Sequence, residues 1–505
     1  MGKIRLPVPV LLYLLAVVIP ISFKLGPLLM TGLRFFLLIM IVPLMIRLLM
    51  GAYGKVLLTD ILFIAHIAWS AVSLGVNNPS EVVQQVGSVG IEFLGGYVVG
   101  RAYIQTGEAF AALCRALVII VLLTLPFALF ESVTGRPLII EFLRKIPGVN
   151  SVAIISIQGR LGLQRVQGSF AHPIHYGLFC SLALSLAFVG LKNLSGRVWR
   201  YGSCTLVALS GFLSLSSGAL LAIVLQVSLI SWSMAFATIR QRWWLLLALF
   251  TVAYVVIDTL SNRTPLDVFM TYATFSSHNA YWRSIIFEWG MKSVWQHPLY
   301  GIGWNDWVRP AFMKSGSVDN FWLLTAMRFG LPGFCTLALG YIIATAHVMR
   351  RDFSADPMLT LFRRAWVFTF LGLSFTISTV HIWSNIYSFV FFMFGAGLWM
   401  ITTKTSPAAQ STKENTPDHR ANRSDRPPIN TGVNTGVNTG VNTDVNTGAS
   451  RLAALPKTPA AKSPAPQTTL RATGKQLYTR FPSGPQNAPP DPGPPGSRSD
   501  TKPTK

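Results

Sequence analysis

Apolar runs long enough to cross a bilayer recur along the first 402 residues of this sequence. A transmembrane helix needs about 20 predominantly apolar residues. Such runs fall at residues 6–22, 27–50, 56–76, 82–100, 109–132, 173–191, 201–215, 217–237, 243–260, 318–348, 364–381 and 384–402. The pattern predicts an all-α, polytopic membrane domain over 1–402 with about 12 transmembrane helices. The first run lacks a small-residue cleavage pattern, so we interpret it as a transmembrane helix rather than a signal peptide.

The composition changes completely after the last apolar run. Pro, Thr, Asn, Ser and Lys dominate residues 403–505, and Asn-Thr-Gly-Val repeats occupy 430–448. Such a segment cannot bury enough apolar surface to fold. The sequence therefore predicts a disordered tail over 403–505.

The overall composition supports a membrane protein and argues against a nucleic-acid partner. Charged residues make up 12% of the chain, about half the share typical of soluble proteins. The net charge of +23 is shared between the two regions, but basic residues of 1–402 cluster at the ends of apolar runs, as the positive-inside rule predicts. The four cysteines lie in apolar segments without CxxC spacing, which indicates neither a disulfide framework nor a zinc site.

The basic residues between the runs also predict an orientation. With twelve spans, they fall on one side of the membrane: Lys3, Arg5, Arg47, Lys55, Arg101, Lys192, Arg197, Arg200, Arg240, Arg242, Arg350, Arg351, Arg363 and Arg364. Both termini are then cytoplasmic, and two long loops, 133–172 and 261–317, lie on the outer, periplasmic face. The first loop breaks the charge rule, because it carries Arg136, Arg144, Lys145, Arg160 and Arg165. An anionic ligand is the simplest reason for this excess.

Candidate chemistry is concentrated in these outer segments. No Walker A loop, GxGxxG, HExxH or GxSxG occurs in a usable context, which argues against an ATP-driven pump. The polar residues that remain are Arg160, Arg165, His172, Ser216, Ser217, His278, Trp282, Arg283, His297, Gly301, Gly303, Asp319 and Asn320.

Their order along the chain resembles a known family. R-x-x-G-S-F-x-H-P begins at Arg165, an SSGA segment begins at Ser216, W-R follows at Trp282, and H-P-L-x-G-I-G begins at His297. Together with the polar pair before the next apolar run, this set resembles the O-antigen ligase and polysaccharide polymerase superfamily. The resemblance implies a glycosyltransferase of the membrane-embedded GT-C type in the bacterial inner membrane. It also implies that no metal, nucleotide or other cofactor is needed.

The resemblance further implies a substrate and partners. Family members transfer a glycan from an undecaprenyl-diphosphate carrier to an acceptor hydroxyl at the periplasmic face. The expected partners are therefore the carrier-linked oligosaccharide, membrane lipids, and proteins that regulate chain length or export. Catalytic roles fall to Arg165 and Arg283, which match the family's arginines, and to Asp319 as general base. Substrate-binding roles are expected for Arg160, His172, His278, Trp282, Asn320, Gly301 and Gly303.

Two departures from the ligase pattern favour a polymerase of exopolysaccharide or O-antigen repeat units. Ser217 stands where ligases usually have arginine, and Asp319 stands where they usually have histidine. The base role then lies with Asp319, or alternatively with His278 or His172. Structural interpretations remain for each feature: Asp319 as a helix N-cap, the HPLYGIG residues as a turn, and SSGA as a helix-packing patch.

Two alternative functions remain open. One is an O-antigen ligase that transfers glycan to lipid A core. The other is a secondary transporter or flippase, which would use charged groups within spans; Arg34, Asp60 and His66 lie in such positions. Arg34 and Asp60 are also suited to an internal ion pair. Transporters commonly contain similar halves, and no such repeat is visible, which favours the enzyme.

Overall fold

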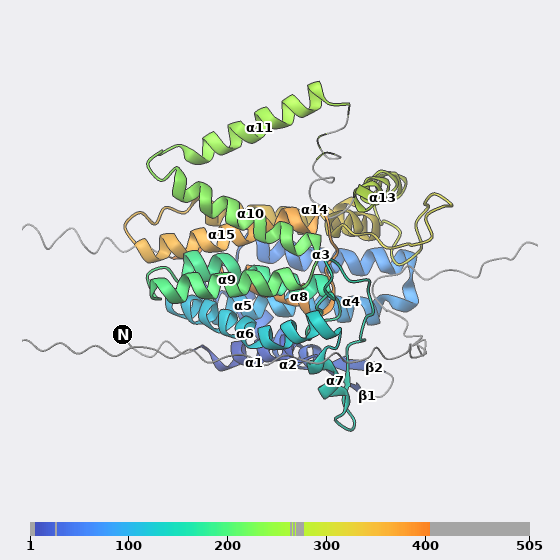
Figure 1. Cartoon of the computed structure of the whole chain (residues 1–505). Coiled ribbons are helices and arrows are strands. Elements are labelled where there is room, and N and C mark those ends of the chain that lie inside the picture. Colours follow the sequence, from blue (N-terminus) through green and yellow to red (C-terminus); the bar gives the residue numbers. More distant parts are fainter. Residues whose placement is uncertain (1–5, 26–27, 263–264, 266–267, 269–276, 404–505) are drawn as a thin grey trace, which may run out of the picture. The chain divides into compact units, whose positions relative to one another are not determined.

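The computed structural model describes residues 6–403 except 26–27, 263–264, 266–267 and 269–276, and it is mainly helical (Figure 1). Each of the twelve predicted runs coincides with a helical segment, and ten of these are long and apolar enough to cross a membrane. The other two, α1 (Val8–Val18) and α9 (Arg197–Leu213), are shorter. The predicted all-α, multi-pass membrane fold is thus confirmed. Apart from Thr403, the predicted tail lies outside the described residues.

The remaining membrane helices follow in chain order, two of them with a π-helical turn. They are α2 (Gly32–Leu49), α3 (Leu58–Asn77), α4 (Val82–Gly90) continued by η2 (Ile91–Gly95) and α5 (Gly96–Tyr103), α6 (Gly107–Thr134), α8 (Pro173–Ser185) continued by η3 (Leu186–Gly190), α10 (Ser217–Ala235), α11 (Arg242–Leu260), α14 (Phe321–Arg350), α15 (Pro357–Ile377), α16 (Ser384–Gly395) and α17 (Trp399–Thr402). Two helices outside the apolar runs, α7 (Leu138–Arg144) and α13 (Ser277–Gln296), lie in the long loops.

A small sheet separates the first two membrane helices. Strands β1 (Ile21–Leu25) and β2 (Leu28–Thr31) form an antiparallel hairpin, and β3 (Asn150–Ser151) from the first long loop pairs with β1. The predicted apolar runs 6–22 and 27–50 extend into this hairpin at residues 21–22 and 28–31. The chain leaves the helical conformation at Ile19, and helix α2 starts only where the Thr31 hydroxyl caps it by accepting from the Arg34 amide at 3.1 Å. Hydropathy alone does not detect these boundaries.

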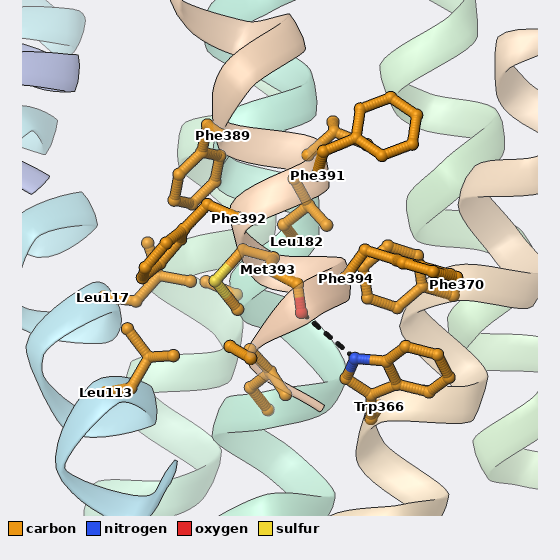
Figure 2. Close-up of a cluster of buried hydrophobic side chains, with 14 of the residues drawn as sticks. Leu113, Leu117, Leu182, Trp366, Phe370, Phe389, Phe391, Phe392, Met393 and Phe394 are labelled. Atoms are coloured by element: carbon orange, nitrogen blue, oxygen red, sulfur yellow. Dashed lines mark hydrogen bonds between the residues drawn. The ribbon is translucent and has the colours of Figure 1, made fainter. Parts of the chain in front are cut away.

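Helix α16 forms the centre of the hydrophobic core, and every residue from Ile386 to Gly395 is buried. Figure 2 shows its aromatic side chains packed against α6, α8 and α15, with the Trp366 indole donating to the Met393 carbonyl at 3.1 Å. Helices α5 and α16 approach each other closely at Gly100 and Gly395. A Cβ at either position would overlap the backbone of the other helix. Glycine at these positions therefore permits the backbone contact, as in other membrane bundles.

The charged groups inside the bundle are paired differently from the sequence expectation. Asp60 binds Arg101, with 3.3 Å between Arg101 Nη2 and Asp60 Oδ2, and both side chains are fully buried. Arg34 instead binds Glu92, with 2.8 Å between Nε and Oε1. The expected Arg34–Asp60 pair was wrong, because η2 and α5 place Glu92 and Arg101 next to these groups. His66 is also satisfied, since its Nδ1 lies 2.8 Å from the Gly333 carbonyl oxygen.

Candidate active site

A cavity of about 800 Å³ brings together residues from six separate parts of the chain. The contributing parts are the loop before α8, the start of α10, helix α13, the loop before α14, helix α14, and the loop between α15 and α16. Its polar and charged lining residues are Arg160, Arg165, His172, Ser216, Ser217, Trp282, Arg283, Lys314, Ser315, Ser317, Asp319, Arg328, His381 and Trp383. Most of the candidate residues therefore meet in a single cavity.

The N-termini of four helices converge on this cavity. His172, Ser216 and Trp383 occupy the N-cap positions of α8, α10 and α16 and line the cavity, and Asp319 directly precedes the N-cap of α14. The N-terminus of a helix carries a partial positive charge of about +0.5. Together with the basic side chains, this arrangement favours an anionic ligand.

The loop that carries Arg160 and Arg165 is held by hydrogen bonds between side chains and the backbone. The Glu131 carboxylate on α6 accepts from the amides of Gln167 at 2.8 Å and Gly168 at 3.0 Å. Gly168 has a φ of +60°, which favours glycine. The Arg160 guanidinium donates to the Leu215 carbonyl at 2.8 Å, so this loop is joined to the segment before α10. These contacts fix where Arg165 enters the cavity.

Arg165 and Arg283 line the cavity and are themselves largely buried. Arg165 Nε and Arg283 Nη1 are buried and have no hydrogen-bond partner among the described residues. Burial lowers the pKa of Arg165 to about 10, with a smaller contribution from Arg160. Burial also lowers the pKa of Arg283, against the opposing effect of Asp319. Arg165 remains a cation at neutral pH, and buried cations of this kind are normally paired with an anion.

Asp319 and Asn320 have separate roles at the start of α14. The Asn320 side chain caps the helix by accepting from the Leu323 amide at 3.0 Å, and Asn320 does not line the cavity. Asp319 does line it, so the N-cap interpretation applies to the neighbouring residue. Protein surrounds the Asp319 carboxyl even though the cavity leaves it accessible. Burial therefore raises its pKa, and the nearby Arg283 opposes that shift.

Gly301 and Gly303 stabilise a break in α14 and do not line the cavity. Helix α14 is interrupted at Gly330, where φ is +67°. The HPLYGIG loop binds the backbone around this break: Ile302 N donates to Met327 O at 2.8 Å, and Gly303 N donates to Arg328 O at 2.9 Å. A Cβ at either loop glycine would overlap neighbouring atoms. The structure supports the architectural interpretation of this motif.

The remaining candidate residues divide between those that line the cavity and those that make structural contacts. Trp282 lines the cavity beside Arg283, whereas the side chain of His278 lies outside the described residues. Ser216 caps α10 by accepting from the Ala219 amide at 3.4 Å, and a Cβ at Gly218 would overlap Val380. The SSGA segment therefore packs closely and also borders the cavity. Among the described residues, no three His, Cys, Asp or Glu side chains are arranged to hold a metal ion.

The sequence reasoning missed Lys314, Arg328, His381 and Trp383. Arg328 left a signal, because an arginine inside an apolar run is costly and usually functional. Lys314 lies in the polar loop that was already under consideration. His381 and Trp383 lie between two apolar runs near the end of the membrane domain, and only the fold brings them to the cavity.

Comparison with known proteins supports the resemblance. A family model described as O-Antigen ligase matches residues 202–338. The matched segment includes Arg283, Asp319 and Arg328 but ends before His381 and begins after Arg165. No curated protein matches the sequence significantly. The family match supports an O-antigen ligase-like superfamily assignment and an enzyme of glycosyltransferase type.

Proposed function

We propose that this O-antigen ligase-like membrane protein polymerises polysaccharide repeat units carried on undecaprenyl diphosphate. The reaction takes place in the cavity at the periplasmic face of a bacterial inner membrane. Arg165 and Arg283 bind the diphosphate, and Asp319 accepts the proton of the attacking hydroxyl. Arg160, His172 and Trp282 complete the lining around the substrate.

One observation carries this proposal: two arginines from distant segments line one cavity, and each has a buried nitrogen without a hydrogen-bond partner among the described residues. Arg165 comes from the loop before α8 and Arg283 from α13. A diphosphate offers several oxygen acceptors, and arginine binds such oxygens in a planar, bidentate geometry. The four helix N-termini add to the positive electrostatic potential in the cavity. The site is therefore suited to an anion with two adjacent charged groups.

The same geometry suits the bond changes of glycosyl transfer. The acceptor hydroxyl oxygen attacks the anomeric carbon of the donor sugar while the bond from that carbon to the phosphate oxygen breaks. The bonding electron pair passes to the diphosphate, where fixed cations stabilise the developing charge. The hydroxyl proton passes to Asp319, whose pKa is raised by burial toward the range useful for a general base.

The orientation is proposed from the positions of charges along the helices. Arg350 and Arg351 lie at the far end of α14 from Asp319, some 30 residues away. The start of α10 borders the cavity, and Arg240 and Arg242 follow its opposite end. The positive-inside rule assigns these basic ends to the cytoplasm, so the cavity faces the periplasm. Both membrane-domain termini are then cytoplasmic, and membrane lipids and chain-length or export proteins are the expected partners.

The ligase alternative rests on the description of the matching family model. Asp319 and Ser217 in place of histidine and arginine favour the polymerase. Glycan analysis of a deletion strain separates the two. A single repeat unit on lipid A core indicates a lost polymerase, whereas full-length glycan left on the carrier indicates a lost ligase.

The direct test uses purified full-length protein in lipid nanodiscs with carrier-diphosphate oligosaccharide. We expect longer glycans to form without added nucleotide or metal. Arg283→Ala and Asp319→Ala should each abolish long-chain product while the protein accumulates normally in the membrane. Lys292→Gln is the matched control, because Lys292 lies on the same helix, pairs with Glu288 at 2.7 Å and is solvent-exposed. Wild-type chain lengths in both alanine variants would refute the site, and dependence on an ion gradient without product would indicate transport.

A further inference from the structure

His172 caps helix α8 and also lines the cavity. The helix begins at Pro173, which has no backbone N–H, so the amide of Ile174 is the first that needs an acceptor. His172 Nδ1 accepts from that amide at 3.1 Å. Serine, aspartate and asparagine are the usual residues at such a position, and each of them would cap the helix. An imidazole adds a second ring nitrogen, Nε2, which extends beyond the capping contact.

The capping contact determines which nitrogen of this ring carries the proton. A backbone N–H is always a donor, so Nδ1 is the unprotonated acceptor, and a neutral imidazole then carries its proton on Nε2. Burial, followed by the positive charge of Arg165, lowers the pKa of His172 to about 4, so the ring is neutral at pH 7. Within the described part of the chain, the cap is the hydrogen bond that the ring makes. Nε2 is therefore a neutral donor for a ligand in the cavity.

Aromatic neighbours hold the His172 ring in place. The centre of the Trp383 ring lies 5.8 Å from that of His172 and 3.9 Å from that of His175. Trp383 is the N-cap of α16, and His175 is buried within α8. The Nε2–H group is thus fixed where the N-termini of α8 and α16 meet the cavity. A donor that is fixed before binding loses little conformational entropy when a ligand arrives.

The surroundings of His172 favour an anionic oxygen as the acceptor. Arg165 lies close enough to lower the pKa of His172, and the two helix N-termini add partial positive charge. A second cation at this position would be repelled by Arg165, whereas a neutral N–H adds a hydrogen bond without adding charge. The oxygens of a diphosphate point in several directions. A planar guanidinium binds those in its own plane, and a donor from another element is suited to a further oxygen.

We propose that His172 Nε2–H donates to a phosphoryl oxygen of the carrier diphosphate that Arg165 binds. This hydrogen bond strengthens as the bonding electron pair passes to the diphosphate, so His172 stabilises the leaving group. The proton stays on Nε2 throughout, and the Ile174 amide occupies Nδ1, so His172 does not act as the base. The inference rests on the proposed function, since it takes the diphosphate to bind at Arg165 and Arg283.

Two substitutions separate the capping role of His172 from its role as a donor. Asparagine in His172→Asn keeps an oxygen near the position of Nδ1, where it caps the helix, and has no atom at the position of Nε2. Glutamine in His172→Gln places its amide near the position of Nε2 and loses the cap. His172→Asp is a second variant that caps the helix without a donor, and its negative charge should weaken diphosphate binding further.

The test measures Kd of undecaprenyl diphosphate, with and without an attached disaccharide, for full-length protein in nanodiscs. We expect His172→Asn to keep the wild-type Tm and to raise Kd about tenfold for both probes, the effect of one hydrogen bond to a charged group. His172→Gln should show the opposite pattern, a lower Tm with Kd close to the wild-type value. Wild-type Kd values in both His172→Asn and His172→Asp overturn the inference. A Kd that rises only for the glycosylated probe places the donor on the sugar and overturns the phosphate assignment.

Arginine variants distinguish a failure of this inference from a failure of the proposed function. Arg165→Gln and Arg283→Gln should each weaken both probes, and Lys292→Gln should affect neither. Unchanged binding in both arginine variants overturns the diphosphate site itself, whereas weaker binding there with wild-type binding in His172→Asn overturns only the role of His172. Chain extension by His172→Asn should still fall at low pH as in the wild type, because Asp319 is the base. Loss of that fall would identify His172 as the base and overturn the inference.

Discussion

The base role of Asp319 is tested most directly by Asp319→Asn, which keeps the shape of the side chain and removes its proton-accepting capacity. A positioned general base contributes typically 10²- to 10⁴-fold to rate, so kcat should fall by about that factor. Binding of the carrier substrate should be unchanged or tighter, because Asp319 is the only carboxylate among the described lining residues. The expected signature is therefore a loss of kcat without a rise in KM.

The pH dependence gives a second, independent measurement. Burial raises the pKa of Asp319 above its usual value, although Arg283 opposes the shift. A base must be deprotonated to act, so wild-type activity should fall as the pH is lowered through this raised pKa. Asp319→Asn should lose that acidic limb, and Asp319→His should retain activity with the limb moved toward about pH 6.5, the ordinary histidine value.

The assay is chain extension by purified protein in nanodiscs, followed by gel separation of products from pH 4 to pH 9. Intact folding is checked for each variant by thermal unfolding. An Asp319→Asn variant with kcat within threefold of the wild type would falsify the base assignment. An unchanged acidic limb in that variant would place the titrating group elsewhere, with His172 as the next candidate.

Three further predictions concern residues that support the site. Glu131→Gln should raise KM about tenfold, because an amide group replaces one of the two oxygens that accept from Gln167 and Gly168. Chain extension at varied substrate concentration measures KM, and an unchanged KM would show that the loop needs no such anchor. Gly303→Ala should lower Tm, since its Cβ would overlap Asn78; a Tm equal to that of the wild type would contradict the architectural role of this glycine. Asp60→Asn should destabilise the bundle by about 3–5 kcal/mol, because it leaves the buried Arg101 unpaired. Thermal unfolding in detergent measures this loss, and an unchanged Tm would mean that Arg101 finds another partner.

Hydropathy was sufficient to find the helices because burial in a bilayer requires a continuous apolar run of about 20 residues. Each of the twelve runs corresponds to a helical segment. The errors fell at boundaries such as 21–31, where a hairpin replaces the ends of two runs. Hydrogen bonding and capping decide such boundaries, and neither changes the local hydropathy.

Motif order identified much of the cavity. Arg165, His172, Trp282, Arg283 and Asp319 all line it, although Arg165 and Asp319 lie more than 150 residues apart. Gly301 and Gly303 were assigned to the substrate but support the broken helix α14. A glycine in a polar loop has the same sequence signal whether it approaches a ligand or another part of the backbone.

The sequence by itself therefore determined the membrane class, the helical segments and the family of chemistry, because these follow from local composition and from residue types in a fixed order. Only the tertiary structure decided which charged groups are neighbours. It paired Arg34 with Glu92 and Asp60 with Arg101, and it brought Arg328 and His381 into the cavity. The rotation of each helix about its axis sets these contacts, and that rotation depends on packing against the whole bundle rather than on any single segment.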